Sequence, residues 1–178
     1  MLILNKELSG HILDIGGGGE GIIGRLYQSQ VIAIDHRQEE LDEAPGGFEK
    51  VLVDATDLQF PAFSFEHVTF FFTLMFMDAD VQEKAIKEAA RVLITGGLLH
   101  IWDCDIESAY PEPFRISLEI QLPNEHISTT YGVGKLGSQN ESSISGLCVE
   151  AELIPVKHET GPDGFHMVWQ KSRMVNHK

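Results

Sequence analysis

The sequence has 178 residues, a length that predicts a single domain over 1–178. Hydrophobic residues make up 43% of it, so the chain has the apolar surface needed to fold and is not disordered as a whole. The formal net charge is −14, which disfavours nucleic acid and anionic membrane surfaces as partners because their phosphate groups would repel the chain.

Up to residue 105, short apolar runs alternate with helix-like segments, which is typical of a parallel sheet with helices on its faces. Strands are predicted at 11–15, 31–35, 50–53, 66–72 and 98–103. Helices are predicted at 20–30, at 37–43, and from an Asp80 cap to a stop at Gly96–Gly97.

After residue 105 the pattern changes. Apolar and polar residues alternate over 114–122, the period of a half-buried strand, and 126–131 can pair with it as a hairpin. We call the insertion at about 106–137 the arm. Because an apolar two-stranded ribbon is marginal alone, we expect the arm to close over the substrate site or to form a homodimer with the same arm of a second chain.

The remaining elements complete the sheet. They are a helix behind a capping box of Ser138 and Glu141, a strand at 153–158, a turn at Gly161–Gly164 and a strand at 165–170. The sequence therefore predicts a three-layer, Rossmann-like α/β domain. Its seven-strand sheet is mostly parallel with an antiparallel last strand, and a β-hairpin is inserted at about 106–137.

The most informative motif lies between Ile12 and Gly21. A strand that runs into glycines and then into a helix lets the backbone approach a ligand at the positive end of that helix. Gly16, Gly18 and Gly21 satisfy the GxGxxG pattern of dinucleotide-binding proteins. The pattern alone is weak, since a glycine turn can serve only to pack a helix on a strand.

Acidic residues stand at the carboxyl ends of three of the predicted strands. Asp35 lies 19 residues after Gly16, where a carboxylate can accept hydrogen bonds from ribose hydroxyls. Asp54, before Ala55, is placed to read an adenine amino group, and Asp14 either caps the glycine loop or recognises a cationic ligand. Three acids at one edge of a sheet suit a positively charged ligand better than a pyrophosphate, which they would repel.

These motifs, in this order, resemble the class I S-adenosylmethionine (SAM)-dependent methyltransferases, and most closely their small type 11 group. The resemblance covers most of the chain. It rests on the glycine loop at 12–21, the acid strand at 31–35, Asp54–Ala55, the fourth strand at 65–72, the "RVLKPGG"-like turn and fifth strand at 91–103, and the two final strands.

The resemblance implies that SAM is the cofactor and that a methyl group passes to a small-molecule acceptor by in-line displacement. It implies cofactor contacts at Asp14, Gly16, Gly17, Gly18, Asp35, His36, Asp54, Ala55 and Phe72. Asp103, at the end of the fifth strand, and His158 and His166, near the final turn, are the candidate catalytic residues.

The sequence also departs from the family pattern. Glu20 stands where the family has its third glycine, and Thr95 replaces the usual proline before Gly96–Gly97. Ten residues precede the first strand, so we expect a substrate lid to come from the arm or from another subunit, if there is one. Two alternatives stay open: an NAD(P)-dependent reductase, and a non-catalytic SAM-binding or partner protein.

Compartment and metal content follow from what the sequence lacks. The longest apolar run, at 68–77, is about half a membrane span, and the first ten residues do not resemble a signal peptide. Cys104 and Cys148 form no disulfide framework, and no His/Cys spacing is typical of a metal site. We expect a cytoplasmic protein without a metal ion.

Overall fold

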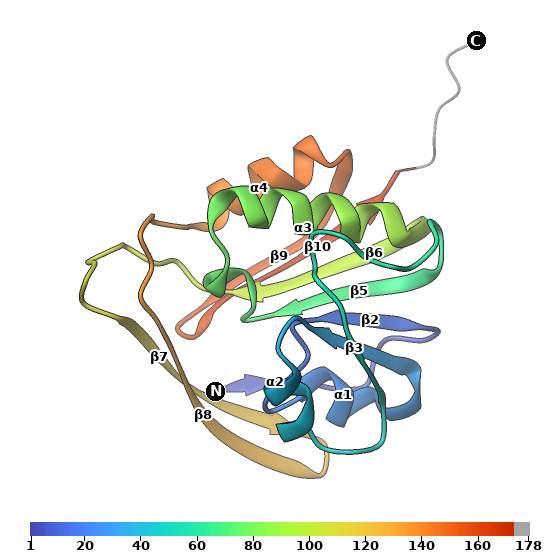
Figure 1. The fold of residues 1–178 in the computed structure, drawn as a ribbon, viewed down its shortest axis with the longest axis horizontal. Coiled ribbons are helices and arrows are strands. Elements are labelled where there is room, and N and C mark those ends of the chain that lie inside the picture. Colours follow the sequence, from blue (N-terminus) through green and yellow to red (C-terminus); the bar gives the residue numbers. More distant parts are fainter. Residues whose placement is uncertain (173–178) are drawn as a thin grey trace.

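The computed structural model describes residues 1–172 and contains a seven-stranded sheet of order β4-β3-β2-β5-β6-β10-β9 (Figure 1). All paired neighbours are parallel except those of β10, which runs antiparallel to β6 and β9. The strands of this sheet are β2 (Ile12–Ile15), β3 (Val31–Asp35), β4 (Glu49–Leu52), β5 (Phe65–Phe71), β6 (Leu93–Asp103), β9 (Leu153–Gly161) and β10 (Gly164–Lys171). The predicted fold class is confirmed.

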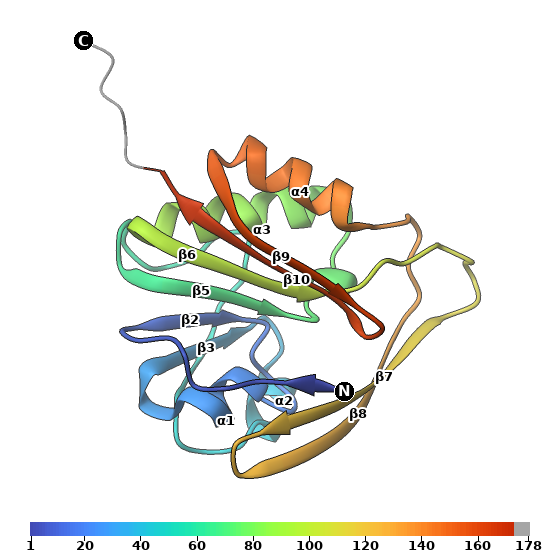
Figure 2. The ribbon, with the colours of Figure 1, turned by 180° about the vertical axis from the view of Figure 1, so that it is seen from behind.

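Helices cover both faces of the sheet (Figures 1 and 2). On one face α3 (Ala79–Val92) and α4 (Glu141–Glu150) bury a core that includes Phe70. On the other, α1 (Ile22–Tyr27), continued by the 3₁₀ turn η1 (Gln28–Gln30), buries a second core around Phe71, and α2 (Gln38–Glu43) lies beside it. In the described part of the chain no helix is long and apolar enough to cross a membrane.

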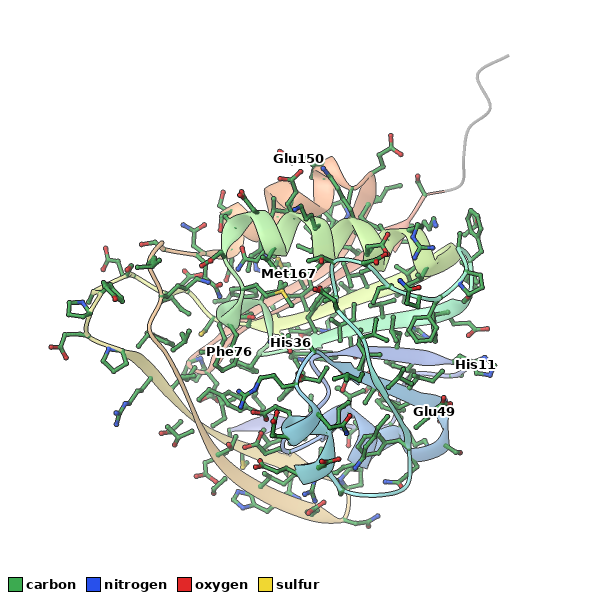
Figure 3. The ribbon with its side chains drawn as sticks, in the orientation of Figure 1. His11, His36, Glu49, Phe76, Glu150 and Met167 are labelled. Atoms are coloured by element: carbon green, nitrogen blue, oxygen red, sulfur yellow. The ribbon has the colours of Figure 1, made fainter. Side chains whose placement is uncertain are left out.

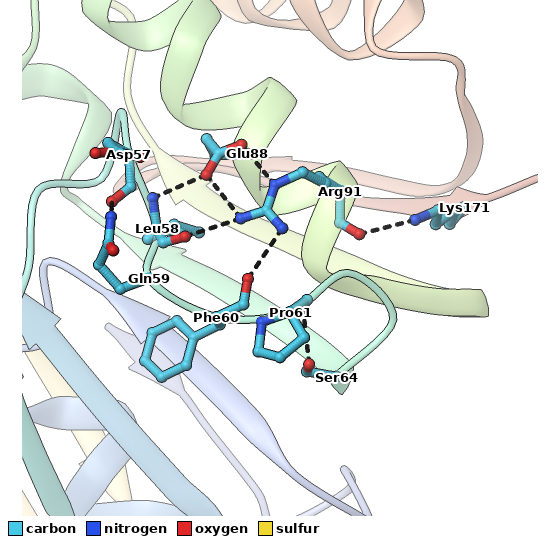
Figure 4. A network of polar contacts seen from close by, with 9 residues as sticks. All are labelled: Asp57, Leu58, Gln59, Phe60, Pro61, Ser64, Glu88, Arg91 and Lys171. Atoms are coloured by element: carbon cyan, nitrogen blue, oxygen red, sulfur yellow. Dashed lines mark hydrogen bonds and ion pairs between the residues drawn. The ribbon is translucent and has the colours of Figure 1, made fainter.

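The crossover between β4 and β5 contains no helix and is held in place by polar contacts with α3 (Figure 4). Arg91 donates to the carbonyl oxygens of Leu58 and Phe60, each at 2.9 Å. Glu88 pairs with Arg91 at 2.7 Å and accepts a hydrogen bond from the Leu58 amide. These contacts fix a long loop that would otherwise expose unpaired backbone groups.

The arm folds onto its own chain. Its strands β7 (Phe114–Leu122) and β8 (Glu125–Val133) form the predicted antiparallel hairpin, and Leu118 and Ile120 on the apolar face are fully buried in the second core. A two-residue strand, β1 (Leu2–Ile3), pairs parallel with β7. A strand of two residues has no periodicity that the sequence could reveal, so β1 was not predicted. The pairing of arms between two chains stays a prediction.

Two predicted element ends were wrong. Helix α3 is capped by Asp78 instead of Asp80 and ends at Val92, and Gly96–Gly97 lies inside β6 instead of after a helix. The reason is the pairing of β6 with β5. It already begins at Leu93, opposite Phe65, and continues beyond a bulge, so the residues after Val92 belong to the strand.

The helix cap before α4 was also assigned to the wrong residues. Asn140 is the N-cap and Ser143 completes the capping box, in place of Ser138 and Glu141. The Ser143 amide donates to the Asn140 carboxamide oxygen at 2.8 Å, and the Asn140 amide donates to the Ser143 hydroxyl at 3.0 Å. Ser can return this hydrogen bond as Glu does, and this alternative was overlooked.

Because the arm is part of the core, Leu118→Ala is expected to lower the free energy of unfolding by about 3 kcal/mol, through lost burial and the cavity left behind. Leu136, with 70% of its surface exposed, is the matched control, and Leu136→Ala should change stability by less than about 0.5 kcal/mol. Urea unfolding followed by circular dichroism measures both. Equal values for the two variants would contradict the packing of the arm.

Candidate functional site

The glycine loop after β2 turns sharply over the carboxyl end of β3. The amides of Gly16 and Gly17 both donate to the Ile34 carbonyl, at 2.8 and 3.0 Å, and the Gly19 amide donates to the Glu40 carbonyl of α2 at 2.8 Å. Gly16 has a φ of +74°, and a Cβ there would lie 2.3 Å from the Thr73 side chain. Glycine is therefore required at this position for both backbone conformation and space.

The acids predicted to contact the cofactor meet at this edge, and each has one carboxylate oxygen already bonded. Oδ1 of Asp14 accepts from the Thr69 hydroxyl at 2.6 Å. Oδ1 of Asp35 and of Asp54 accepts from the backbone amide two residues later, at 3.0 and 2.8 Å. Within residues 1–172 the second oxygen of each carboxylate accepts no hydrogen bond, so all three can still receive donors from a ligand.

The pKa values of two of these groups are shifted in opposite directions, that of Asp14 by burial and that of Asp54 by hydrogen bonds. Asp14 is 2% exposed, and this burial raises its pKa to about 7, with a further contribution from the charge of Asp35. Hydrogen bonds from Thr56 instead hold the pKa of Asp54 below its ordinary value. A cation bound beside Asp14 would therefore favour its ionised form.

The other predicted cofactor residues lie at the same edge. His36 follows β3 and lies 3.5 Å from Asp35, and Figure 3 labels it near the centre of the view, between Phe76 on one side and His11 and Glu49 on the other. A Cβ at Gly18 would lie 2.6 Å from Glu40. Ala55 packs against the first core. The contacts of all these residues with a cofactor stay predictions.

Phe72 directly follows β5 and has a strained backbone conformation. It has a φ of 49°, which is unusual for a residue other than glycine, and its amide donates to the Trp102 carbonyl at 2.7 Å. The side chain is 2% exposed. This turn directs the chain into the 3₁₀ turn η2 (Leu74–Phe76) and so places aromatic side chains beside the glycine loop.

The arm contacts this edge through β8. The hydroxyls of Thr129 and Tyr131 both donate to the Glu20 carboxylate, the second at 3.3 Å. The Tyr131 ring lies 6.0 Å from the Phe72 ring and 6.3 Å from the Phe76 ring, measured between centroids. Sequence reasoning missed Tyr131, although the unusual Glu20 in the glycine loop was a signal that a partner stood nearby.

Asp103, predicted as catalytic, is fully buried and has both oxygens occupied. Oδ1 accepts from the Gln139 side chain at 2.7 Å and from the Cys104 amide at 2.9 Å, and Oδ2 accepts from the Met75 amide at 3.1 Å. Burial raises its pKa to about 6. The carboxylate therefore joins β6, η2 and the segment before α4, and its surroundings do not support contact with a substrate.

The two predicted catalytic histidines lie on opposite faces of the sheet. His158 is exposed on β9 and lies 2.8 Å from Glu141 at the start of α4. His166 stacks on Trp102 at 4.1 Å on the other face, where burial lowers its pKa to about 4. The structure thus brings neither together with the other or with Asp103 in one catalytic group.

A cavity of about 340 Å³ lies between the chain start and the β9–β10 turn. Phe72, Trp102 and His166 are among its lining residues, and the glycine loop is not. It therefore adjoins the acid-rich edge without containing it. Phe72 is the residue that connects the two regions.

Comparison with known proteins gives a consistent result. A family model described as a methyltransferase domain matches residues 13–101, while a search of the curated proteins finds no match. Similar solved structures include a protein from Pyrococcus horikoshii OT3, with a TM-score of 0.67, 15% identity, and coverage of 93% of this chain and 84% of that one.

Two further similar structures are named as enzymes. One is an amino pentose methyltransferase from Micromonospora echinaspora with SAM bound, with a TM-score of 0.65, 14% identity, and coverage of 92% and 84% of the two chains. The other is a sugar N-methyltransferase from Streptoalloteichus sp. ATCC 53650, with a TM-score of 0.64, 14% identity, and coverage of 93% and 81%. At these identities the likeness shows a shared fold.

Asp35→Ala is expected to weaken SAM binding about tenfold or more, because a charge-assisted hydrogen bond contributes roughly 1.5–3 kcal/mol. Calorimetric titration of the variant with SAM measures the change. Asp80→Ala, an exposed acid on α3, is the charge-matched control and should bind as the wild type does. Unchanged affinity in Asp35→Ala would reject the ribose assignment.

The raised pKa of Asp14 predicts a fall in stability as pH rises. Between its ordinary pKa of 3.8 and about 7, the folded chain binds a proton that the unfolded chain has lost, so this contribution is full in acid and disappears toward neutral pH. Asp14→Asn should therefore lose less stability than the wild type between pH 5 and pH 8, measured by urea unfolding.

Asp54→Asn provides the opposite control. Since the pKa of Asp54 is lowered, its contribution is lost only in acid below this range, and the variant should follow the wild-type slope between pH 5 and pH 8. A slope for Asp14→Asn equal to that of the wild type would contradict the assigned protonation of Asp14.

Proposed function

The chain belongs to the methyltransferase domain family, and from this premise we propose that the methyl acceptor is a small molecule. The protein is a class I SAM-dependent methyltransferase of the type 11 group, and SAM is its cofactor. The family assignment decides against the reductase and against the non-catalytic binding protein, the two alternatives that the sequence left open.

The residues at the acid-rich edge fit this cofactor. SAM, when bound, supplies an electrophilic methyl group on a positively charged sulfur. The second oxygens of Asp35 and Asp54 would accept hydrogen bonds from ribose hydroxyls and from the adenine amino group, respectively. Asp14, on β2 directly before the glycine loop, would face the cationic part of the ligand.

The observation that carries the small-molecule proposal is the attachment of the arm at three places near the glycine loop. Thr129 and Tyr131 donate to Glu20, Arg25 of α1 pairs with Glu125 of β8 at 2.5 Å, and Lys135 donates to the Met77 carbonyl at 2.7 Å. An arm fixed in this way restricts access to the cofactor. It favours an acceptor that fits beneath or beside it over a polymer.

The chain's own residues then have two tasks at this edge. They position the acceptor toward the methyl group, and they exclude water from the site. Phe72 and Tyr131 supply the apolar wall. Burial strongly raises the pKa of Tyr131, so its hydroxyl stays protonated and donates to Glu20 instead of acting as a base. We propose that methyl transfer is accelerated by positioning of the acceptor and not by proton abstraction by a dedicated base.

The names of two similar structures point the same way. One acts on an amino pentose and the other is a sugar N-methyltransferase, so both handle small compounds on this fold. The strongly negative net charge of −14 adds a second support, because it opposes binding to nucleic acid.

The proposal is tested by incubating the protein with SAM and a panel of metabolites, and by measuring S-adenosylhomocysteine together with the mass of the acceptor. We expect a gain of one methyl group in a small molecule, in step with S-adenosylhomocysteine release. Transfer RNA and unfolded proteins, supplied as alternative acceptors, should remain unmethylated. Methylation of either one in preference to every small molecule would overturn the proposal.

A further inference from the structure

Five side chains gather where β8 of the arm meets the glycine loop, and we call them the Tyr131 cluster: Glu20, Phe72, Phe76, Thr129 and Tyr131. Phe76 is 52% exposed, so the cluster is open to a ligand on that side. Phe72, in contrast, is buried next to the end of β5. The cluster therefore connects solvent with the edge at which the cofactor contacts are predicted.

The Glu20 carboxylate has no positively charged partner among residues 1–172. Its hydrogen bonds come only from the neutral hydroxyls of Thr129 and Tyr131. Arg25 donates to the backbone carbonyl of Glu20 instead, and its guanidinium pairs with Glu125. Lys135 is held by the carbonyls of Met75 and Met77. A half-buried carboxylate without a cation is costly to keep, and a cationic ligand would relieve that cost.

The aromatic rings add a second preference for a cation. Tyr131 lies nearly perpendicular to Phe76, with an interplanar angle of 83°, and is inclined by 34° to Phe72. Phe76, which is 52% exposed, is the ring of this group that a ligand reaches from solvent. The negative face of such a ring attracts ammonium groups more than neutral groups of the same shape. Carboxylate and rings thus select for the same charge.

We propose that the Tyr131 cluster binds the acceptor's nitrogen, and that the acceptor is an aliphatic amine. This inference rests on the proposed function and names the class of its small molecule. The amine enters as an ammonium ion and loses one proton to water. Its lone pair then forms the new carbon–nitrogen bond as the sulfur–carbon bond breaks, so the positive charge passes from sulfur to nitrogen, where Glu20 and the rings stabilise it.

An alcohol acceptor fits these residues less well. A hydroxyl group must lose its proton to become a good nucleophile, which requires a base within hydrogen-bond reach. In this part of the described chain Tyr131 is a donor, and the buried Asp103 already accepts three hydrogen bonds. Each oxygen of the Glu20 carboxylate already accepts one, which leaves only a weak base for an alcohol. An aliphatic ammonium group has a pKa of about 10.4, so a small fraction is neutral near pH 7 and can react without such a base.

The test compares two probes of equal shape and different charge, choline and the neutral 3,3-dimethylbutan-1-ol. Each is titrated calorimetrically into the full chain in the presence of S-adenosylhomocysteine. We expect choline to bind at least tenfold more tightly than the neutral probe. Glu20→Gln should reduce this preference to less than threefold, and Phe76→Ala should weaken choline binding more than binding of the neutral probe.

Two matched controls lie outside the cluster. Glu119→Gln removes an exposed carboxylate elsewhere on the arm, and Tyr110→Ala removes an exposed ring; both should keep the wild-type preference for choline. Equal affinity for the two probes, no measurable binding of choline at millimolar concentration, or an unchanged preference in Glu20→Gln would each overturn the inference.

The affinity for S-adenosylhomocysteine, measured in the same variants, separates this inference from the proposed function. We expect Glu20→Gln to leave that affinity unchanged. If it falls while the preference for choline persists, Glu20 serves the cofactor and the amine assignment is wrong, although methyl transfer to a small molecule still stands. If the wild type binds no S-adenosylhomocysteine at all, the proposed function itself fails.

Discussion

The site depends on the burial of one apolar strand face, that of β7, against α1 and the sheet. Leu118 and Ile120 complete the second core, and each buried side chain of this size contributes about 2 kcal/mol or more. Because β8 is bonded to β7 along its whole length, packing of β7 also places β8 over the glycine loop. A hydrophobic contact thereby determines the position of the polar residues at the cofactor edge.

The acids at that edge illustrate how a site is kept ready for a cation. Asp14, Asp35 and Asp54 come from three neighbouring parts of the sheet, and each retains one oxygen without a donor in the described residues. The burial of Asp14 and its repulsion by Asp35 are unfavourable in the free protein, as the raised pKa of Asp14 indicates. A positively charged ligand reverses both effects, so stability and binding are linked through the same carboxylates.

Sequence reasoning succeeded where function follows strand order. Parallel strands end at one edge, so the Asp14, Asp35 and Asp54 positions could be grouped without a structure. It failed where the face of a strand matters: His158 and His166 both flank the last turn, but their side chains point to opposite faces. The contact of Tyr131 with Glu20 joins residues 111 positions apart, and no local pattern predicts such a pair.

Glu20 and the arm are two of the features that distinguish this chain, and the structure joins them. A third glycine in the loop would offer β8 no side chain, and the hydroxyls of Thr129 and Tyr131 would then lack their acceptor. Conversely, a glutamate in this loop without the arm would be a solvated charge with little effect. Glu20 and the arm thus depend on each other. Together they adapt a common cofactor-binding fold to a particular acceptor.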